Sequence, residues 1–227
     1  MPYSDWTYNA KNPLRRFSHR KRMIKSVNLA LKALPEKGRL LDFGCADGYM
    51  VSLLQQITGP GRIFGYEPYP DSKVDESTII YNRWDDVAGQ QFDVVTCFEV
   101  LEHFSPDNQR KLLRQIRSLL KAGGTLIISV PVEYGPVGVF KGVLRKVTDR
   151  RQRHWYSWRN IARTLLSRPI EGARDSDGYL DHVGFYYRAL TALLNECGFT
   201  TVSRSFSPYN FGGAAVNSQI YTVLKRK

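Results

Sequence analysis

The sequence predicts an α/β fold built on a doubly wound, mostly parallel sheet. Short apolar runs alternate with helix-patterned segments between residues 38 and 130, as parallel strands and their crossover helices require. The first run, at 38–43, leads into a turn of small residues that contains Gly44 and Gly48, and then into an apolar helical pattern. Glycine suits a backbone that approaches a ligand or takes a positive φ, so this turn predicts a ligand crevice at the carboxyl end of the strand.

The elements follow from local patterns in chain order. Pro13 and Pro35 bound an expected helix at 13–34, whose apolar stripe should pack beside the sheet and whose basic start should lie at the surface. The expected strands are 38–43, 62–67, 77–81, 92–98 and 124–130, and the expected helices between them are 48–57 and 106–121. Residues 82–91 leave no room for a full crossover helix, so we expect a short helix there or none.

The segment 131–180 interrupts this alternation and is expected to be a substrate-side insertion. Its first half places apolar side chains on one helical face: Val139, Phe140, Val143, Leu144 and Val147. Between Lys141 and Arg168 there are nine basic residues and one acid, interleaved with tryptophan and tyrosine. This pattern is typical of a lid helix packed on its own domain, of a helix on an anionic membrane, or of a surface for a nucleic-acid strand.

An acidic residue at the end of the second strand points to the ligand. Glu67 follows Gly48 by 19 residues, where a doubly wound fold presents a carboxylate to the two hydroxyls of a ribose. Asp42 and Asp47 in the first turn would repel the pyrophosphate of a dinucleotide but suit a cationic ligand. Residues 40–103 contain 11 acidic and 3 basic residues in a chain of formal charge +12. These charges favour S-adenosylmethionine as the adenosine-bearing cofactor.

These residues resemble a known family. The run Leu-Leu-Asp-Phe-Gly-Cys-Ala-Asp-Gly at 40–48, the acid Glu67 and the run Phe-Asp-Val-Val-Thr-Cys-Phe-Glu-Val-Leu-Glu-His at 92–103 are similar to three motifs of the class I S-adenosylmethionine-dependent methyltransferases. The resemblance covers about residues 36–131, with Ala46 where that family often has glycine. It implies a seven-stranded, Rossmann-like sheet that ends in an antiparallel hairpin, here 199–206 and 219–224, after a helix at 187–197 that Gly198 terminates.

The resemblance and the turn chemistry together give a predicted cofactor-binding set. Asp85 in this set stands where the family often offers a carboxylate to the adenine amino group. The set is Asp42, Gly44, Ala46, Gly48, Glu67, Asp85, Phe98 and Glu99.

Candidate catalytic groups follow the fourth strand. Glu99, Glu102 and His103 share a face if the chain turns helically there, and His182 is a more distant candidate partner. His103 is expected to act as a general base that Glu102 orients, or these four residues are expected to bind a divalent cation. The run Glu-x-x-Glu-His with a later histidine is similar to metal-dependent RNA 2′-O-methyltransferases and to ubiquinone-pathway O-methyltransferases. Without these roles, His182 would cap the following helix, and Glu99 would contact the methionine portion of the cofactor or the backbone.

Length and composition set the remaining expectations. The 227 residues suit one α/β domain, with a basic helix at 13–34, a cofactor-binding core at 36–131, a lid at 132–184 and a last helix and strands at 185–227. Three cysteines without metal-ligand spacing indicate a reduced, cytoplasmic protein. The longest apolar run, at 126–132, is too short to span a bilayer. A charge of +12 predicts an anionic partner.

The predicted function is methyl transfer from S-adenosylmethionine. The favoured acceptor is an oxygen of a small, lipid- or sugar-linked molecule, at a membrane surface contacted peripherally through 139–168. The alternative enzyme is a metal-assisted RNA 2′-O-methyltransferase, for which the basic surroundings would bind the nucleic acid. The alternative of another class is a non-catalytic binding protein that retains the fold, which the intact Asp42, Gly44, Gly48 and Glu67 disfavour.

Overall fold

The structure is a computed structural model, which describes residues 13–69, 78–149, 153–168, 170 and 182–227. Its centre is a seven-stranded sheet in the order β3-β2-β1-β4-β5-β7-β6. The strands are β1 (Leu40–Phe43), β2 (Ile63–Tyr66), β3 (Ile80–Tyr81), β4 (Phe92–Phe98), β5 (Leu120–Pro131), β6 (Phe199–Ser207) and β7 (Gln219–Arg226). β1 pairs in parallel with both β2 and β4, and β7 is antiparallel to both β5 and β6. The predicted fold class, including the closing antiparallel hairpin, is confirmed.

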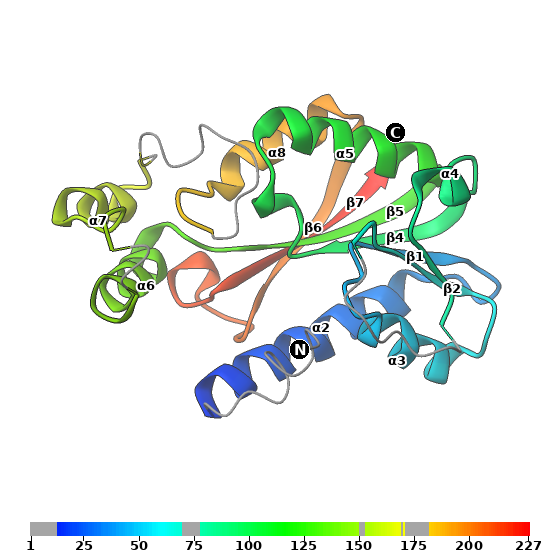
Figure 1. The fold of residues 1–227 in the computed structure, drawn as a ribbon, viewed down its shortest axis with the longest axis horizontal. Helices are drawn as coiled ribbons and strands as arrows, with labels where there is room; N and C mark the ends of the chain where they lie inside the picture. The colour runs from blue at the N-terminus through cyan, green and yellow to red at the C-terminus, as the bar shows by residue number, and fades with distance from the viewer. Residues whose placement is uncertain (1–12, 70–77, 150–152, 169, 171–181) are drawn as a thin grey trace.

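Helices cover both faces of the sheet (Figure 1). One face carries α2 (Pro13–Ala33) and α3 (Tyr49–Thr58), and the other carries α5 (Pro106–Leu119) and α8 (Tyr187–Glu196). The short α4 (Trp84–Val87) occupies the tight connection before β4, as its length predicts. Gly198 has a φ of +82° just after α8, in agreement with its predicted role as a terminating glycine.

Each face of the sheet has its own buried core. On one side, Val51 and Leu54 of α3 pack with Val27 and Ala30 of α2 against the strands. On the other side, residues of α5 and α8 such as Ile116 and Leu194 pack against the opposite faces of β4 and β5. The strands in the middle of the sheet are therefore buried on both faces, which explains why they read as continuous apolar runs.

Most element bounds differ from those expected by one or two residues, and two strands differ by more. β5 begins at Leu120 rather than at residue 124, because Leu120 pairs with Phe92 before a register shift that brings Thr125 beside Val94. The intervening Lys121–Gly124 stretch is a local irregularity that periodicity alone does not locate. The expected strand at 77–81 is observed as Ile80–Tyr81, and its first residue lies outside the described residues.

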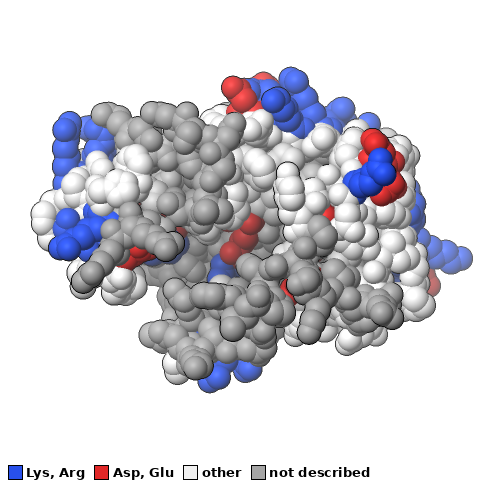
Figure 2. Space-filling model, viewed as in Figure 1, with Lys and Arg blue, Asp and Glu red and all other residues white. Residues whose placement is uncertain are grey.

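Beyond β5 lie α6 (Gly135–Thr148) and α7 (Trp158–Leu165), which pack against each other at one end of the molecule (Figure 1). Lys and Arg side chains gather at this end on the face shown in Figure 2. No helix within the described part of the chain has the length and apolar character needed to cross a membrane. Cys45, Cys97 and Cys197 are free and buried.

Candidate active site

The turn between β1 and α3 forms the floor of a crevice at the carboxyl ends of the strands. Gly44 and Gly48 have φ values of +80° and +73°, which favour glycine. A Cβ atom on Gly44 would stand 2.4 Å from Cγ2 of Val100, so the close approach of the two loops also requires glycine. Ala46 adopts a φ of +50°, a conformation that costs an alanine about 1–2 kcal/mol.

Glu67 lies directly after β2, and its carboxylate faces this turn. One carboxylate oxygen accepts a hydrogen bond from the backbone N–H of Ala46, and the other accepts one from the N–H of Tyr69, both at 3.1 Å. Glu67 lines a cavity of about 390 Å³ together with Gly44, Val100 and His103. The carboxylate is thus held at the edge of a space large enough for part of a ligand.

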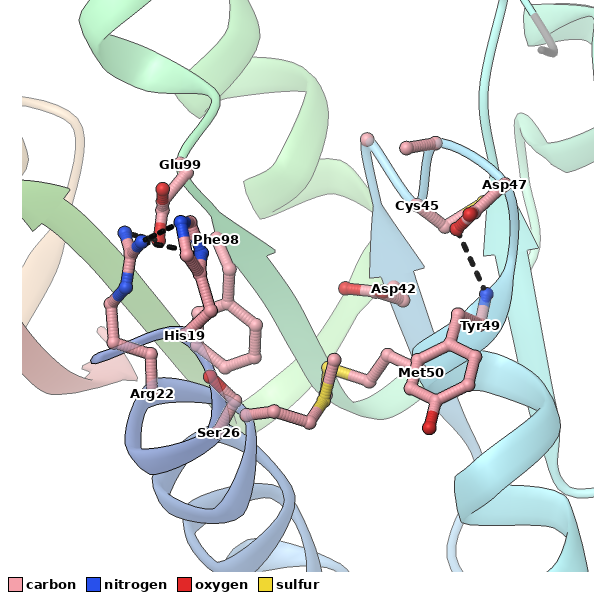
Figure 3. Close-up of a pocket in the computed structure, with 13 residues that line it drawn as sticks. His19, Arg22, Ser26, Asp42, Cys45, Asp47, Tyr49, Met50, Phe98 and Glu99 are labelled. Carbon is pink, nitrogen blue, oxygen red and sulfur yellow. Dashed lines mark hydrogen bonds and ion pairs between the residues drawn. The ribbon is translucent and has the colours of Figure 1, made fainter. Parts of the chain in front are cut away.

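Asp42 supplies buried negative charge beneath the crevice. Its carboxylate accepts a hydrogen bond of 2.7 Å from the Thr96 hydroxyl. Burial raises the pKa of Asp42 to about 6, although the Thr96 hydrogen bond opposes this shift. Asp47, in the same turn, accepts a hydrogen bond from the backbone N–H of Tyr49. Figure 3 shows Asp42 and Asp47 on one side of a second part of the crevice, which also includes Gly44 and Ala46.

An ion pair faces these acids across the pocket (Figure 3). Nη1 of Arg22 in α2 lies 2.6 Å from Oε1 of Glu99, and Nη2 of Arg22 lies 2.6 Å from Nδ1 of His19. Burial favours a raised pKa for the Glu99 carboxyl, but the Arg22 guanidinium and the nearby imidazoles of His182 and His19 together outweigh burial and hold that pKa below its usual value. The pocket therefore offers both an ionised carboxylate and a guanidinium at the end of β4.

Glu102, His103 and His182 form a cluster beside the crevice. One ligand atom from each lies within 4.8 Å of the others. The two imidazole rings are 5.3 Å apart and nearly perpendicular. Glu102 is fully buried, in a 3₁₀ turn at Leu101–His103. Burial lowers the pKa of His182 to about 4, so its imidazole is neutral near pH 7 and can orient His103 or bind a cation.

The structure separates some of the residues that the sequence grouped together. Glu99 pairs with Arg22 and is not a member of the Glu102, His103 and His182 group. Asp85 is exposed in α4, and its Oδ2 lies 3.7 Å from Nη2 of Arg83. It lines neither of the two described parts of the crevice. Phe98, by contrast, lines the pocket, and Gly48 is the N-cap residue of α3.

The wall that α2 contributes was not anticipated. His19, Arg22, Met23 and Ser26 line the pocket beside Asp42 and Glu99. The expectation that the basic start of this helix lies at the surface holds for Arg20 and Lys21, but Arg22 is only 16% exposed. The acid-free basic run at 11–25 was the available signal, although it does not indicate which cation turns inward.

Comparison with known proteins agrees with this geometry. A family model described as a methyltransferase domain matches residues 15–204. The chain belongs to this methyltransferase family. The match includes the glycine turn, Glu67 and the residues after β4, and it confirms the identification as a class I S-adenosylmethionine-dependent methyltransferase made from those motifs.

Two curated relatives of this methyltransferase are ubiquinone biosynthesis O-methyltransferases. The protein of Escherichia fergusonii is 33% identical over 102 residues, which are 40% of this chain and 42% of that protein. The protein of Salmonella enteritidis is 32% identical over 102 residues, 40% of this chain and 41% of that protein. The match thus spans about two fifths of the length of each relative.

Solved structures share the fold at low sequence identity. Magnesium protoporphyrin IX methyltransferase from Synechocystis, with bound SAH, has a TM-score of 0.56 and 16% identity over 95% of this chain and 88% of that one. The N-methyltransferase NodS from Bradyrhizobium japonicum, in complex with SAH, has a TM-score of 0.54 and 16% identity over 95% of this chain and 89% of the NodS chain. At this identity the likeness concerns the fold.

Proposed function

We propose that this chain transfers a methyl group from S-adenosylmethionine to an oxygen of a small, lipid- or sugar-linked acceptor. The observation that carries the proposal is that His103 lines the same cavity as Glu67. A carboxylate suited to the cofactor ribose and a side chain able to accept a proton thus face one space.

The charged side chains of the crevice complement the charged and polar groups of S-adenosylmethionine. Glu67 would accept hydrogen bonds from the ribose hydroxyls, and the buried Asp42 carboxylate would lie near the positive charge of the cofactor. Arg22 would bind the carboxylate of the amino-acid end, while Glu99 would bind its ammonium group. Gly44 allows close backbone approach. A role for Asp85 at the adenine remains a prediction.

His103 is the proposed general base for the acceptor. When bound, the cofactor supplies an electrophilic methyl group on a sulfonium with a good leaving group. The protein then has to align the acceptor oxygen and remove its proton, and a hydroxyl needs this help more than an amine does. The neutral His182 ring, packed edge to face on His103, would hold the base in position without adding charge.

The acceptor class draws on the relatives and on the surface. The two relatives cited above are named as O-methyltransferases of ubiquinone biosynthesis, which supports an oxygen acceptor with an apolar portion. The N-methyltransferases among the structural neighbours share only the fold. A basic surface at 139–168 is compatible with an acceptor held at an anionic membrane.

A second candidate is a metal-assisted RNA 2′-O-methyltransferase. It is favoured by the convergence of Glu102, His103 and His182 within 4.8 Å, since a carboxylate and two imidazoles can bind a divalent cation. Titration calorimetry with Mn²⁺ and Zn²⁺ would distinguish this metal-assisted enzyme from the O-methyltransferase proposed above. Saturable binding that His182→Ala abolishes would favour the metal enzyme, and the absence of binding would exclude it.

Calorimetry with S-adenosylmethionine tests the main proposal. Removal of the Glu67 carboxylate in Glu67→Ala should weaken binding by roughly 100-fold, since two charged hydrogen bonds are lost. Glu36→Ala, which alters an exposed carboxylate away from the crevice, is the matched control. If the native chain does not bind the cofactor, the enzyme proposal fails and the non-catalytic alternative replaces it.

A further inference from the structure

We propose that α6, α7 and the loop before β7 form a docking surface for an anionic lipid membrane. The proposal rests on the proposed function, because it explains how the active site would meet a lipid-linked acceptor. Its evidence is independent of the active site and comes from the orientation of α6.

Two of the three basic side chains of α6, those of Lys141 and Arg145, are turned toward the protein. Glu133 follows β5 by two residues and is 7% exposed. Nζ of Lys141 lies 2.9 Å from one of its carboxylate oxygens, and Nη1 of Arg145 lies 2.6 Å from the other. Arg145 also donates a hydrogen bond to the Tyr156 hydroxyl at 2.7 Å. These contacts fix the rotation of the helix about its axis, because a turned helix would leave the buried Glu133 without its cations.

Two glycines occupy the same inward face. A Cβ atom on Gly138 would lie 2.2 Å from the carbonyl oxygen of Glu133, and one on Gly142 would lie 3.1 Å from the Tyr156 ring. α6 therefore approaches its neighbours closely through glycine and charged residues. Val139 of the helix is partly buried against a small cluster that includes Tyr156 and Ile161, whereas the larger Phe140 and Leu144 are exposed.

Most of the apolar face of α6 is consequently exposed. Phe140 is 70% exposed, Leu144 is 51% exposed and Val147 is 79% exposed. A lid helix that packs this face on its own domain was one of three interpretations of the pattern. The partial burial of Val139 fits it, whereas the exposure of Phe140, Leu144 and Val147 does not. A helix that turns two of its three cations inward and exposes most of its apolar side chains indicates an apolar partner.

Neighbouring elements extend this surface. Trp158 of α7 is 67% exposed, and Nζ of Lys146 lies over its ring, 5.4 Å from the ring centroid. The 3₁₀ turn η2 (Gly213–Ala215), in the loop between β6 and β7, packs against α6. In that loop, Phe211 is 70% exposed. The docking surface comprises the apolar Phe140, Val143, Leu144, Val147, Trp158 and Phe211 and the basic Lys146, Arg153 and Arg159.

Its charge selects a membrane over a second copy of the chain. Arg153 and Arg159 are exposed, Arg159 directly follows the exposed Trp158 in the chain, and Figure 2 shows blue side chains at this end of the molecule. Anionic headgroups would neutralise these cations while the apolar side chains enter the acyl boundary. Two copies facing each other would instead bring like charges together. A nucleic-acid strand would use the cations but leave Phe140 and Val147 in water.

Vesicle co-sedimentation tests the proposal without an activity assay. The probes are vesicles of phosphatidylglycerol with phosphatidylcholine in equal parts, and vesicles of phosphatidylcholine alone. We expect binding to the anionic vesicles that weakens as salt increases. The double variant Phe140→Asp/Val147→Asp should bind at least about 10-fold more weakly, because two apolar anchors become charged.

Val202→Asp is the matched control, since Val202 is 61% exposed on β6 outside the docking surface. It should bind vesicles like the native chain, and both variants should keep native affinity for S-adenosylmethionine. Equal vesicle binding by the double variant and the native chain, no binding to anionic vesicles, or a native dimer that the double variant dissociates would each overturn the proposal. If the native chain binds anionic vesicles but does not bind S-adenosylmethionine, the result contradicts the proposed function and leaves the docking surface intact.

Discussion

Arg22 and Glu99 are joined by a 2.6 Å ion pair that connects α2 to the residue following β4. The pair is largely buried, with 16% and 20% of the two side chains exposed, and Glu99 holds a φ of +55°. A non-glycine residue in this conformation is strained and is typical of functional sites. The N-terminal helix is therefore part of the ligand pocket as well as a cover for the sheet.

We expect Arg22→Met to weaken binding of S-adenosylmethionine by roughly 10- to 100-fold, as the loss of a charged hydrogen bond implies. The reason is that Arg22 is placed to bind the carboxylate of the amino-acid end. Calorimetry with decarboxylated S-adenosylmethionine, which lacks that carboxylate, should show little difference between variant and native chain. An equal loss for both ligands would contradict this role. Arg20→Met, on the exposed side of α2, is the control.

Asp42 should lower the stability of the unliganded protein as pH rises. Its folded pKa of about 6 lies above the ordinary value of 3.8, so the folded state holds the proton more tightly. Stability is then full below the ordinary pKa and is lost as pH rises to about 6. Two pKa units correspond to about 3 kcal/mol. Urea unfolding at pH 8 should show Asp42→Asn more stable by up to that amount, with no difference near pH 3.

The same carboxyl should make cofactor binding depend on pH. A cationic ligand favours the ionised form of Asp42, so affinity should fall as pH decreases through about 6. In Asp42→Asn this dependence should be reduced and the affinity at pH 8 should be lower. Calorimetry across this range measures both effects. A native profile that stays flat through pH 6, or one that Asp42→Asn reproduces, would remove Asp42 from cofactor binding.

Local patterns predicted the sheet and the crevice well, because their signals lie close together in sequence. The strands are apolar runs bounded by glycines and turns, and Glu67 follows β2 at the spacing of the fold. The crevice residues Asp42, Gly44 and Phe98 lie at strand ends for the same reason. Parallel topology brings these ends to one edge, so no long-range information was needed.

The parts that local patterns did not predict depend on long-range pairing. Arg22 meets Glu99 across 77 residues, and nothing near Arg22 distinguishes it from the other cations of α2. The pattern of α6 left open whether its apolar stripe packs on the domain or faces a membrane or a nucleic acid. The buried Glu133 attracts Lys141 and Arg145, which turns most of that stripe outward. Periodicity gives the existence of an apolar face but not the direction in which it points.

Removal of the Glu133 charge should loosen α6. Glu133→Gln would leave Lys141 and Arg145 without their carboxylate, and because both are partly exposed we expect a loss of about 2–3 kcal/mol. Burial favours a raised pKa for Glu133, but Lys141 and Arg145 outweigh it and hold that pKa below 4.5. This stabilisation is present above pH 4.5 and is lost as pH falls below it. Urea unfolding at pH 7 and hydrogen exchange of α6 measure the effect.

The comparison for Glu133→Gln is Asp107→Asn, which removes the carboxylate of a solvent-exposed pair with Arg110. Exposed pairs contribute little, so this variant should unfold like the native protein. If both variants behave alike, the pairing of Glu133 does not hold α6 in place.

The two glycines of α6 provide a matched test of how closely the helix approaches the protein. In a helix interior, Gly→Ala alone stabilises by about 0.5–1 kcal/mol. At Gly138 the added Cβ would stand 2.2 Å from the Glu133 carbonyl oxygen, so the backbone must move and Gly138→Ala should destabilise by about 1–3 kcal/mol. At Gly142 the nearest atom, 3.1 Å away, belongs to the Tyr156 ring, which can shift, so Gly142→Ala should remain within about 1 kcal/mol of native stability. Urea unfolding of both variants decides the matter, because equal stabilities would mean that α6 does not sit against Glu133 as closely as the structure has it.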